Sequence, residues 1–359
     1  MTPSGSGPTG GTVSGAPFVP PRFLADDPCG GRIGPAPSDF RVDEIPAYPL
    51  SGEGEHLFLK VEKVGLNTAE VAQRVARAAG LRERDVGYAG MKDRNAITRQ
   101  WFSVCCKDEN AEAWNLGDGV RILEVTRHKN KLRTGHLTGN RFRIAVVDVP
   151  SGGEERVREM ADELRRSGLP NYFGSQRFGR GGRNLSEAWA WLNGGERSGK
   201  RGRFANKLLP SVLQAEVFNR YTAARLADPT ALLEGEVVRL EGSASGFVVE
   251  DVAAELLRLK DGEIHRTGPL PGPKARPAGA AALALEERIL ADVGLTEESR
   301  AALGKHAPGT RRDLLVQPED LEANASDGSL VLEFSLPAGA YATQVVREFC
   351  GTDWARPRG

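Results

Sequence analysis

The feature that most restricts the fold of this chain is a helix signal enclosed by strand signals in residues 40–104. Asn67 is a typical helix N-cap, Glu70 follows three residues later as its reciprocal partner, and Gly80 is a typical helix end. The flanking segments alternate between apolar and polar residues or are rich in β-branched and aromatic ones, which favours strands. This order predicts an α+β domain built on a sheet. The expected strands cover residues 40–43, 57–62, 86–88 and 101–104.

The turn between the last two expected strands carries the charged triplet Lys92, Asp93 and Arg94. Such a triplet at a strand end is most often a solvated turn. Here, however, Gly87 and Gly90 permit a close approach of the backbone, and two basic, glycine-containing stretches follow downstream. Asp93 is therefore the candidate functional carboxylate.

Two stretches concentrate positive charge in a chain whose 48 Lys and Arg residues balance its 48 Asp and Glu residues. Residues 121–143 and residues 171–207 each carry a net charge of +6. Either stretch alone could be a solvated basic loop, but cations among glycines and aromatic residues also suit contacts with nucleic-acid phosphates. The candidate RNA contacts are Lys129, Lys131, Arg133, Arg177 and Arg180.

Several classes of protein are disfavoured by the composition. The four cysteines show no Cys-x-x-Cys spacing, so we expect neither a metal site nor a disulfide framework, and no cofactor. Residues 1–21 carry no charge and are rich in Gly, Pro, Ser and Thr, which is typical of a flexible tail. The longest run of small apolar residues, 278–285, is too short to cross a bilayer. We therefore expect a soluble, cytoplasmic protein, and nothing in the sequence demands more than a monomer.

Residues 87–104 (GYAGMKDRNAITRQWFSV) resemble the signature of the TruD family of tRNA pseudouridine synthases. Any one match would be weak, but six in the family's order are a specific signal, and together they cover about residues 31–348. The further matches are residues 39–44 (DFRVDE), 54–56 (GEH), 128–133 (HKNKLR) with 139–142 (GNRF), 171–179 (NYFGSQRFG) and 336–343 (LPAGAYAT).

The resemblance implies a fold and an activity. The fold would be a pseudouridine-synthase-type catalytic domain with a mixed or antiparallel sheet, split into residues 22–167 and 318–359. An inserted α+β TRUD domain would occupy residues 168–317. The activity would be the isomerisation of uridine to pseudouridine in tRNA, at uridine-13 of the D-arm.

The resemblance also implies roles for individual residues. Asp93 would be the catalytic aspartate, and Phe142 would stack on the flipped uracil. Asn140 would hold the loop of Phe142, and Phe40 would line the pocket near the same base. We expect that Phe142→Ala impairs activity and leaves the fold nearly intact.

The sequence departs from the family at Gly34, where relatives often carry a lysine. An ionised Asp93 needs a nearby cation, so Arg32, Lys92 or Arg94 is a candidate to replace that lysine. We expect Arg32 or Arg94 to pair with Asp93.

Two other functions are compatible with parts of the sequence. One is an RNA-binding protein of the same fold without catalysis, or an enzyme for other RNAs; the intact turn of Asp93 argues against loss of catalysis. The other is a carboxylate-based nucleoside or glycoside hydrolase, for which the sequence offers no second carboxylate as a general acid.

Overall fold

The structure, a computed structural model, describes residues 16–25, 27–107, 110–194 and 202–351, and the side chains of residues 202–207 are outside the description. The described chain forms two compact units. The large-sheet unit runs from Arg22 to Leu169 and resumes at Val316; the middle unit comprises the residues up to Pro21 and from Pro170 to Leu315. The chain passes between the units at β8 (Leu169–Pro170) and β13 (Leu315–Val316).

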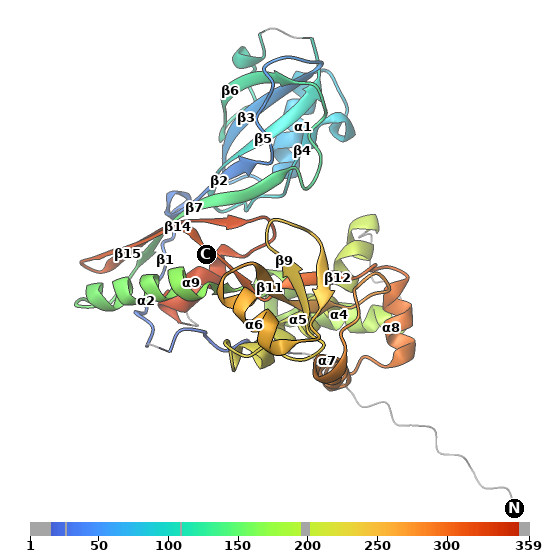
Figure 1. The fold of residues 1–359 in the computed structure, drawn as a ribbon. Helices are drawn as coiled ribbons and strands as arrows, with labels where there is room; N and C mark the ends of the chain where they lie inside the picture. Colours follow the sequence, from blue (N-terminus) through green and yellow to red (C-terminus); the bar gives the residue numbers. More distant parts are fainter. Residues whose placement is uncertain (1–15, 26, 108–109, 195–201, 352–359) are drawn as a thin grey trace, which may run out of the picture. The chain divides into compact units, whose positions relative to one another are not determined.

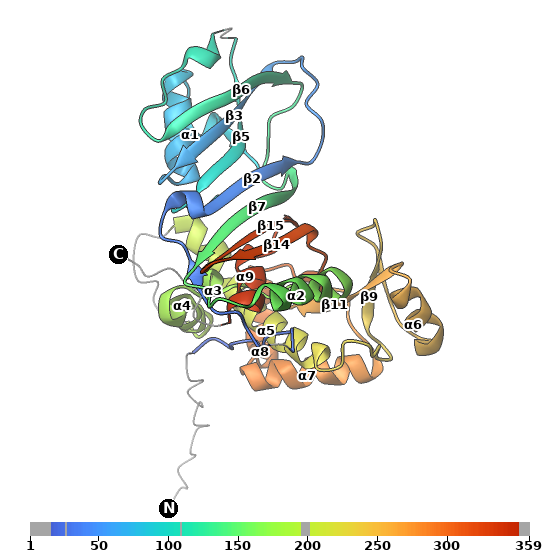
Figure 2. The ribbon, with the colours of Figure 1, turned by 90° about the vertical axis from the view of Figure 1, so that its left-hand side faces the viewer.

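The large-sheet unit is built on a mixed sheet whose main path follows the order β14-β15-β7-β2-β5-β3-β6, as Figure 2 shows. The pairing of β2 with β5 is parallel and the other pairings are antiparallel. Two short strands, β1 and β4, pair with β7 and β5 at the side of this path. The strands are β1 (Arg32–Ile33), β2 (Phe40–Pro46), β3 (His56–Val64), β4 (Gly87–Tyr88), β5 (Ile97–Cys105), β6 (Val120–His128), β7 (Leu137–Val147), β14 (Glu319–Ser326) and β15 (Ser329–Pro337).

Three α-helices cover this sheet (Figure 1). Helix α1 (Thr68–Ala78) buries Val71 and Val75 against β3 and β5, and it begins where the Asn67 amide donates to Glu70 Oε2 at 2.6 Å. Helices α2 (Glu154–Ser167) and α9 (Ala342–Cys350) pack with β7, β14 and β15 around a second core. Short 3₁₀ turns lie at Pro37–Asp39, Glu83–Asp85 and Ala111–Ala113.

The middle unit has a four-stranded sheet in the order β10-β9-β11-β12. Its β11 contacts α5, where Gly268 lies against the rings of Phe218 and Tyr221. The elements are α3 (Ser175–Phe178), a 3₁₀ turn (Arg180–Gly182), α4 (Arg183–Leu192), α5 (Gly202–Leu226), β9 (Val237–Leu240), β10 (Gly246–Val248), α6 (Val252–Lys260), β11 (Ile264–Leu270), α7 (Ala280–Val293), α8 (Glu297–Gly304) and β12 (Thr310–Asp313).

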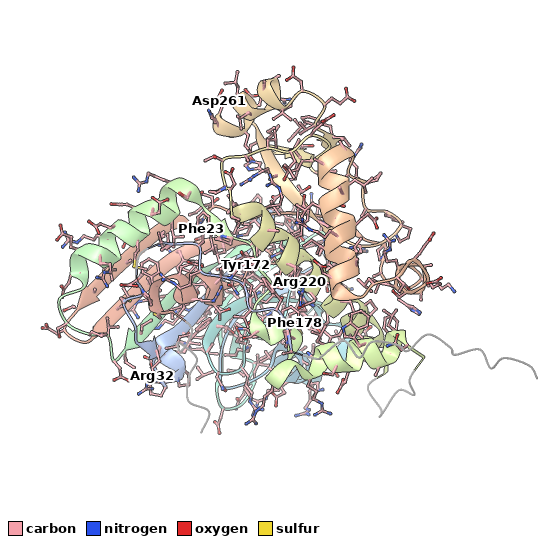
Figure 3. All side chains as sticks on the ribbon, turned by 90° about the horizontal axis from the view of Figure 1, so that it is seen from below. Phe23, Arg32, Tyr172, Phe178, Arg220 and Asp261 are labelled. Carbon is pink, nitrogen blue, oxygen red and sulfur yellow. The ribbon has the colours of Figure 1, made fainter. Side chains whose placement is uncertain are left out.

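Residues 16–21, which the composition assigned to a flexible tail, contact α5. The Phe18 amide donates to the carboxylate of Glu216, and the guanidinium of Arg220 (labelled in Figure 3) lies 5.2 Å from the centre of the Phe18 ring. Residues 1–15 are outside the described part of the chain. No helix within the described ranges combines the length and the apolar character that a membrane span needs.

The expected secondary structure is confirmed where local patterns were strong. The expected α+β class, the strands β2, β3, β4 and β5 and the helix α1 are all present. Strand β6 was not predicted, because the charged residues of this segment were interpreted as a basic stretch. The glycine and proline residues at 268–270 would by themselves favour a loop, but they complete β11, where Pro269 lies opposite Arg311 of β12.

Candidate active site

Asp93 lies in the turn of residues 89–96, which joins β4 to β5 in the large-sheet unit. Asp93 is exposed, whereas Ala89 and Ala96 at the two ends of the turn are buried. The turn therefore places the Asp93 carboxylate at the surface while its own ends are fixed in the core. Four elements hold the turn in position: β2, β3, β5 and the first residue of α1.

A buried ion pair attaches the turn to β2. Lys92 Nζ lies 2.5 Å from Glu44 Oε2, and the two side chains are only 5% and 1% exposed. The other oxygen, Glu44 Oε1, accepts a hydrogen bond from the Trp101 amide at 3.2 Å. Removing one member of such a pair leaves an uncompensated buried charge, so this contact strongly restricts the position of Lys92.

A relay of hydrogen bonds attaches the turn to α1 and β5. The Lys92 amide donates to Thr68 Oγ1 at 2.9 Å, and Thr68 Oγ1 donates to Gln100 Oε1 at 2.9 Å. Gln100 Nε2 in turn donates to the Gly90 carbonyl at 3.1 Å. Both Thr68 and Gln100 are buried, so these bonds compete little with water and fix the backbone on both sides of Met91.

The fourth attachment is Lys63, at the end of β3. Its side chain is fully buried, and its Nζ donates to the Leu66 carbonyl at 2.7 Å and to the Asp93 carbonyl at 2.8 Å. Burial lowers the pKa of the Lys63 ammonium to about 8, and the negative charge of Asp93 limits that decrease. Lys63 thus holds the Asp93 peptide and places a cation in the field of its carboxylate.

Lys63 was not predicted as a site residue, although a signal for it was present in the sequence. Leu57, Leu59 and Val61 point to one face of β3, and Lys63 continues that buried face by the strand period of two. A lysine on the apolar face of a strand needs a polar partner inside the fold. In this protein the partners are the two carbonyl groups of the loop and the turn.

The two arginines expected to pair with Asp93 have other contacts. Arg32, labelled in Figure 3, lies with its Nε 2.7 Å from Asp148 Oδ2. Arg94 Nε donates to the Gly65 carbonyl at 3.0 Å. At Gly34 a Cβ would lie 2.3 Å from Asp39 Oδ2, so a lysine at this position would require the Asp39 side chain to move.

Phe40 and Phe142 lie together beside the turn. Their ring centres are 6.3 Å apart in an edge-to-face arrangement, and Ala96 belongs to the same buried cluster. On the other side, Phe142 stacks on Phe334 with ring centres 5.4 Å apart. Each of the first two rings is only 8% exposed. Phe142→Ala would therefore open a cavity in the core, so the expectation that it leaves the fold nearly intact does not fit this packing.

Asn140 lies two residues before Phe142 on β7, opposite Glu44 on β2. Its Oδ1 is buried and accepts no hydrogen bond from any described residue. Buried amide groups normally find a partner, and such an unsatisfied group is often reserved for a ligand. Asn140 and Glu44 thus bring polar groups to the region between the turn of Asp93 and the aromatic pair.

The candidate RNA contacts are divided between the two units. In the large-sheet unit, Lys129 Nζ lies 2.8 Å from Glu53 Oε1, and Lys131 and Arg133 line a surface hollow. In the middle unit, Arg177 Nη1 donates to Ser211 Oγ at 3.1 Å, and Arg180 is exposed in the 3₁₀ turn Arg180–Gly182. Three basic residues of the second stretch, Arg197, Lys200 and Arg201, lie outside the described residues.

The family model described as tRNA pseudouridine synthase D (TruD) matches residues 22–185 and 205–349. Among curated proteins, a tRNA pseudouridine synthase D of Anaeromyxobacter sp. is 43% identical over 327 residues, which is 89% of this chain and 92% of the relative. Its counterpart in Thermus thermophilus is 40% identical over 341 residues, covering 92% and 93% of the two chains.

A solved structure of a TruD-type protein from Methanosarcina mazei has the same fold. The structural match covers 92% of this chain and 96% of the Methanosarcina mazei chain, with a TM-score of 0.72 and 23% sequence identity. The match of the family model and the identity over nine-tenths of the chain are together decisive. This chain belongs to the TruD family of tRNA pseudouridine synthases and is accordingly an isomerase.

Proposed function

We propose that the large-sheet unit converts one flipped-out uridine of tRNA, uridine-13 of the D-arm, into pseudouridine, and that Asp93 is its catalytic carboxylate. The observation that carries the proposal is the attachment of the Asp93 turn to four elements while Asp93 itself is exposed. A catalytic group must be held within a fraction of an ångström of its productive position, and this turn is built for that purpose. The inserted TRUD domain of the family would correspond to the middle unit.

The reaction needs an oxygen nucleophile or base and no change of oxidation state. The bond between N1 of the base and C1′ of the ribose breaks, the base turns, and C5 bonds to C1′; the proton of C5 is lost and N1 gains one. Asp93 either adds to C1′ or removes the proton of C2′, and both routes develop positive charge at the sugar, which a carboxylate stabilises. The base must leave its stack to reach the carboxylate.

The aromatic pair and Asn140 are proposed to hold the turning base. The remaining exposed edge of Phe142 would pack against the uracil, with Phe40 beside it. The unpartnered Oδ1 side of the Asn140 amide would hydrogen-bond to the base or to its ribose. Lys129, Lys131 and Arg133, together with Arg177 and Arg180, would contact phosphates of the tRNA.

A hydrolase function is disfavoured because the nearby second carboxylate, that of Glu44, is buried and already hydrogen-bonded. Glu44 already accepts hydrogen bonds from the Lys92 ammonium and from the Trp101 amide, and its side chain is 1% exposed. A general acid of a glycosidase must instead reach the leaving group. Membership of the family equally disfavours an RNA-binding protein without catalysis.

The test is the release of tritium from tRNA labelled at C5 of uridine. The Asp93→Asn variant should lose at least about 10²–10⁴-fold in rate, because the neutral amide neither attacks nor accepts a proton, while tRNA binding persists. A tRNA with cytidine in place of uridine-13 should release no tritium from the wild-type enzyme. Tritium release by Asp93→Asn at the wild-type rate would refute the assignment of Asp93.

A further inference from the structure

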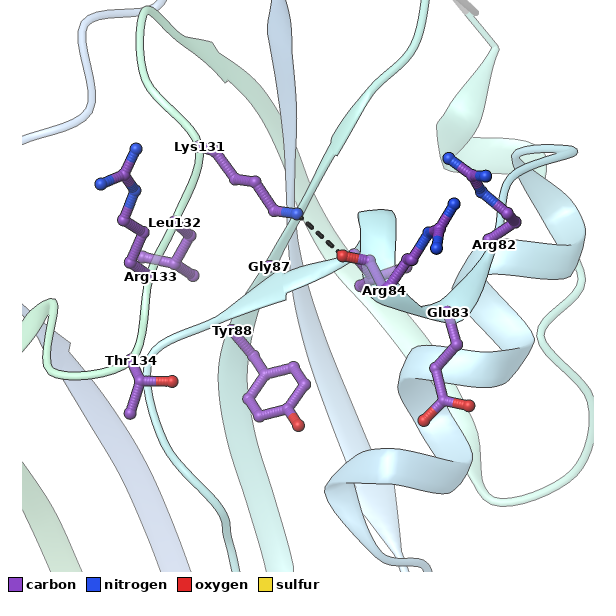
Figure 4. A pocket seen from close by; sticks show the side chains of 10 residues that line it. Arg82, Glu83, Arg84, Gly87, Tyr88, Lys131, Leu132, Arg133 and Thr134 are labelled. Carbon is purple, nitrogen blue, oxygen red and sulfur yellow. Dashed lines mark hydrogen bonds between the residues drawn. The ribbon is translucent and has the colours of Figure 1, made fainter. Parts of the chain in front are cut away.

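The large-sheet unit contains a surface hollow of about 780 Å³ near the catalytic turn (Figure 4). One wall is formed by residues 82–88, which lead from the end of α1 into β4, and the other by residues 131–134, in the loop between β6 and β7. Within the first wall, Gly87 and Tyr88 open the signature motif of residues 87–104, whereas Arg82, Glu83 and Arg84 lie before it. The two walls meet where β4 ends and the turn of Asp93 begins.

The lining of the hollow is strongly cationic. Four basic side chains face it, with Glu83 as the one acidic residue among its lining residues, and Glu83 already accepts a hydrogen bond from Gln73 Nε2 at 3.1 Å. No carboxylate of the described residues lies within ion-pair distance of the guanidinium of Arg84 or Arg133. Arg82 is paired with Asp85, with its Nε 3.0 Å from Asp85 Oδ2, so the positive charge that the hollow offers to an anionic ligand comes from Arg84, Lys131 and Arg133. The four basic residues are Arg82, Arg84, Lys131 and Arg133.

The walls are held in fixed positions. Lys131 Nζ donates to the Arg84 carbonyl at 3.1 Å, as the dashed line in Figure 4 shows, so it bridges the two walls. The Leu132 amide donates to Ser103 Oγ at 2.9 Å. Gly87 allows this close approach, because a Cβ there would lie 2.2 Å from the Leu132 carbonyl oxygen. The hollow is thus preformed, which lowers the entropy cost of binding.

The hollow lies a short distance along the chain from the catalytic carboxylate. Tyr88, which lines it, precedes Asp93 by five residues, which span at most about 18 Å even when fully extended. The Gly135 amide also donates to the Ala89 carbonyl at 2.8 Å, so the loop of Arg133 is attached to the first residue of the catalytic turn. A nucleic-acid strand with its target at Asp93 would reach the hollow within a few nucleotides.

We propose that this hollow is a phosphate-binding subsite for the backbone of the same tRNA, a few nucleotides from the target uridine, with Arg84 and Arg133 as its anchors. The proposal rests on the proposed function and extends it to residues 82–88, which join the basic loop in one site. Guanidinium groups bind phosphate through two hydrogen bonds, which suits an anchor role. The half-buried ring of Tyr88 adds an aromatic surface to the same hollow.

The experiment measures tRNA affinity as a function of salt in the Asp93→Asn background, so that turnover does not alter the RNA. The variants are Arg84→Gln, Arg133→Gln and the double variant. The matched control is the double variant Arg156→Gln/Arg158→Gln, which removes two exposed charges from α2 of the same unit. Inorganic phosphate and tRNA are compared as ligands, to separate a site for free phosphate from a site for the RNA backbone.

Each lost phosphate contact should reduce the steepness of log K against log salt by about 0.7–0.9, which is about a sixfold loss of affinity at 0.1 M salt. The double variant should lose about twice that slope, and the control should retain the wild-type slope. In the active enzyme the double variant should raise KM and leave kcat at saturating tRNA unchanged.

Equal slopes for the double variant and the control would overturn the proposal, as would competition by inorganic phosphate with no effect of the variants on tRNA binding. Failure of the proposed function is a separate outcome. If Asp93→Asn released tritium at the wild-type rate, the assignment of Asp93 would fall, whereas the salt slopes would still decide whether the hollow binds RNA.

Discussion

Lys63→Met separates the contribution of the buried lysine to folding from its contribution to catalysis. The wild-type ammonium is fully buried, and its pKa is lowered from 10.5 to about 8 by desolvation. Since a pKa difference of one corresponds to about 1.4 kcal/mol, the folded state pays about 3 kcal/mol to keep Lys63 charged at neutral pH. A methionine of similar length avoids that cost but gives up the hydrogen bonds to Leu66 and Asp93.

The sign of the pH effect follows from the lowered pKa. Below pH 8 the lysine is charged in both the folded and the unfolded state, so the folded state bears the full desolvation cost of the buried charge. Between pH 8 and 10.5 the folded protein releases this proton before the unfolded chain does, so the unfolded state binds more protons and stability rises with pH. The free energy of unfolding of the wild type relative to Lys63→Met should therefore increase by about 3 kcal/mol from pH 7 to pH 10.5.

Loss of the Lys63 charge should raise the stability of the fold but lower the catalytic rate. Without the ammonium the Asp93 peptide loses one of its four attachments, and a displacement near 1 Å costs on the order of 10²-fold in kcat. The wild-type rate should fall above about pH 8 as Lys63 loses its charge, and the low rate of Lys63→Met should lack that decrease.

The measurements are urea unfolding and tritium release between pH 7 and pH 10. Lys60→Met is the matched control, because Lys60 lies on the same strand but its side chain is 37% exposed. A stability difference between wild type and Lys63→Met that stays constant over this pH range would refute the burial argument. An unchanged kcat in Lys63→Met would refute the positioning role.

Three further sets of variants test the site. Lys92→Met should lower the free energy of unfolding by about 3–5 kcal/mol, because it leaves the Glu44 carboxylate buried and unpaired; Lys92→Met/Glu44→Leu should recover much of this loss in urea unfolding. Phe142→Ala should cost about 3–5 kcal/mol, whereas Phe142→Leu should cost less and still reduce tritium release, and a Phe142→Leu enzyme with wild-type turnover would remove the base-stacking role. Gly34→Lys should destabilise the protein by displacing Asp39, as a lowered midpoint of thermal unfolding would reveal, and an unchanged midpoint would contradict the crowding at Gly34.

Local sequence patterns were sufficient to predict the helices and strands that bury one face. The alternation in residues 57–61 and the cap at Asn67 gave β3 and α1, because burial and capping act over a few neighbouring residues. Strand β6 was not predicted because all of its residues are partly or fully exposed, so no buried apolar face marks it as a strand. The start of β7 at Leu137 is likewise fixed by its pairing with β2 and β15, not by its own residues.

The catalytic candidate and the family could be predicted from the amino-acid sequence, because the residues around Asp93 form one continuous motif. The motif gave no indication that Lys63 holds the Asp93 peptide. Lys63 comes from a strand 30 residues earlier in the chain. Only the register of β3 on β5, with Val64 opposite Ile97, brings its ammonium beneath the turn. Strand register is a property of the assembled sheet, and that is the physical reason why the tertiary structure alone decided this part of the site.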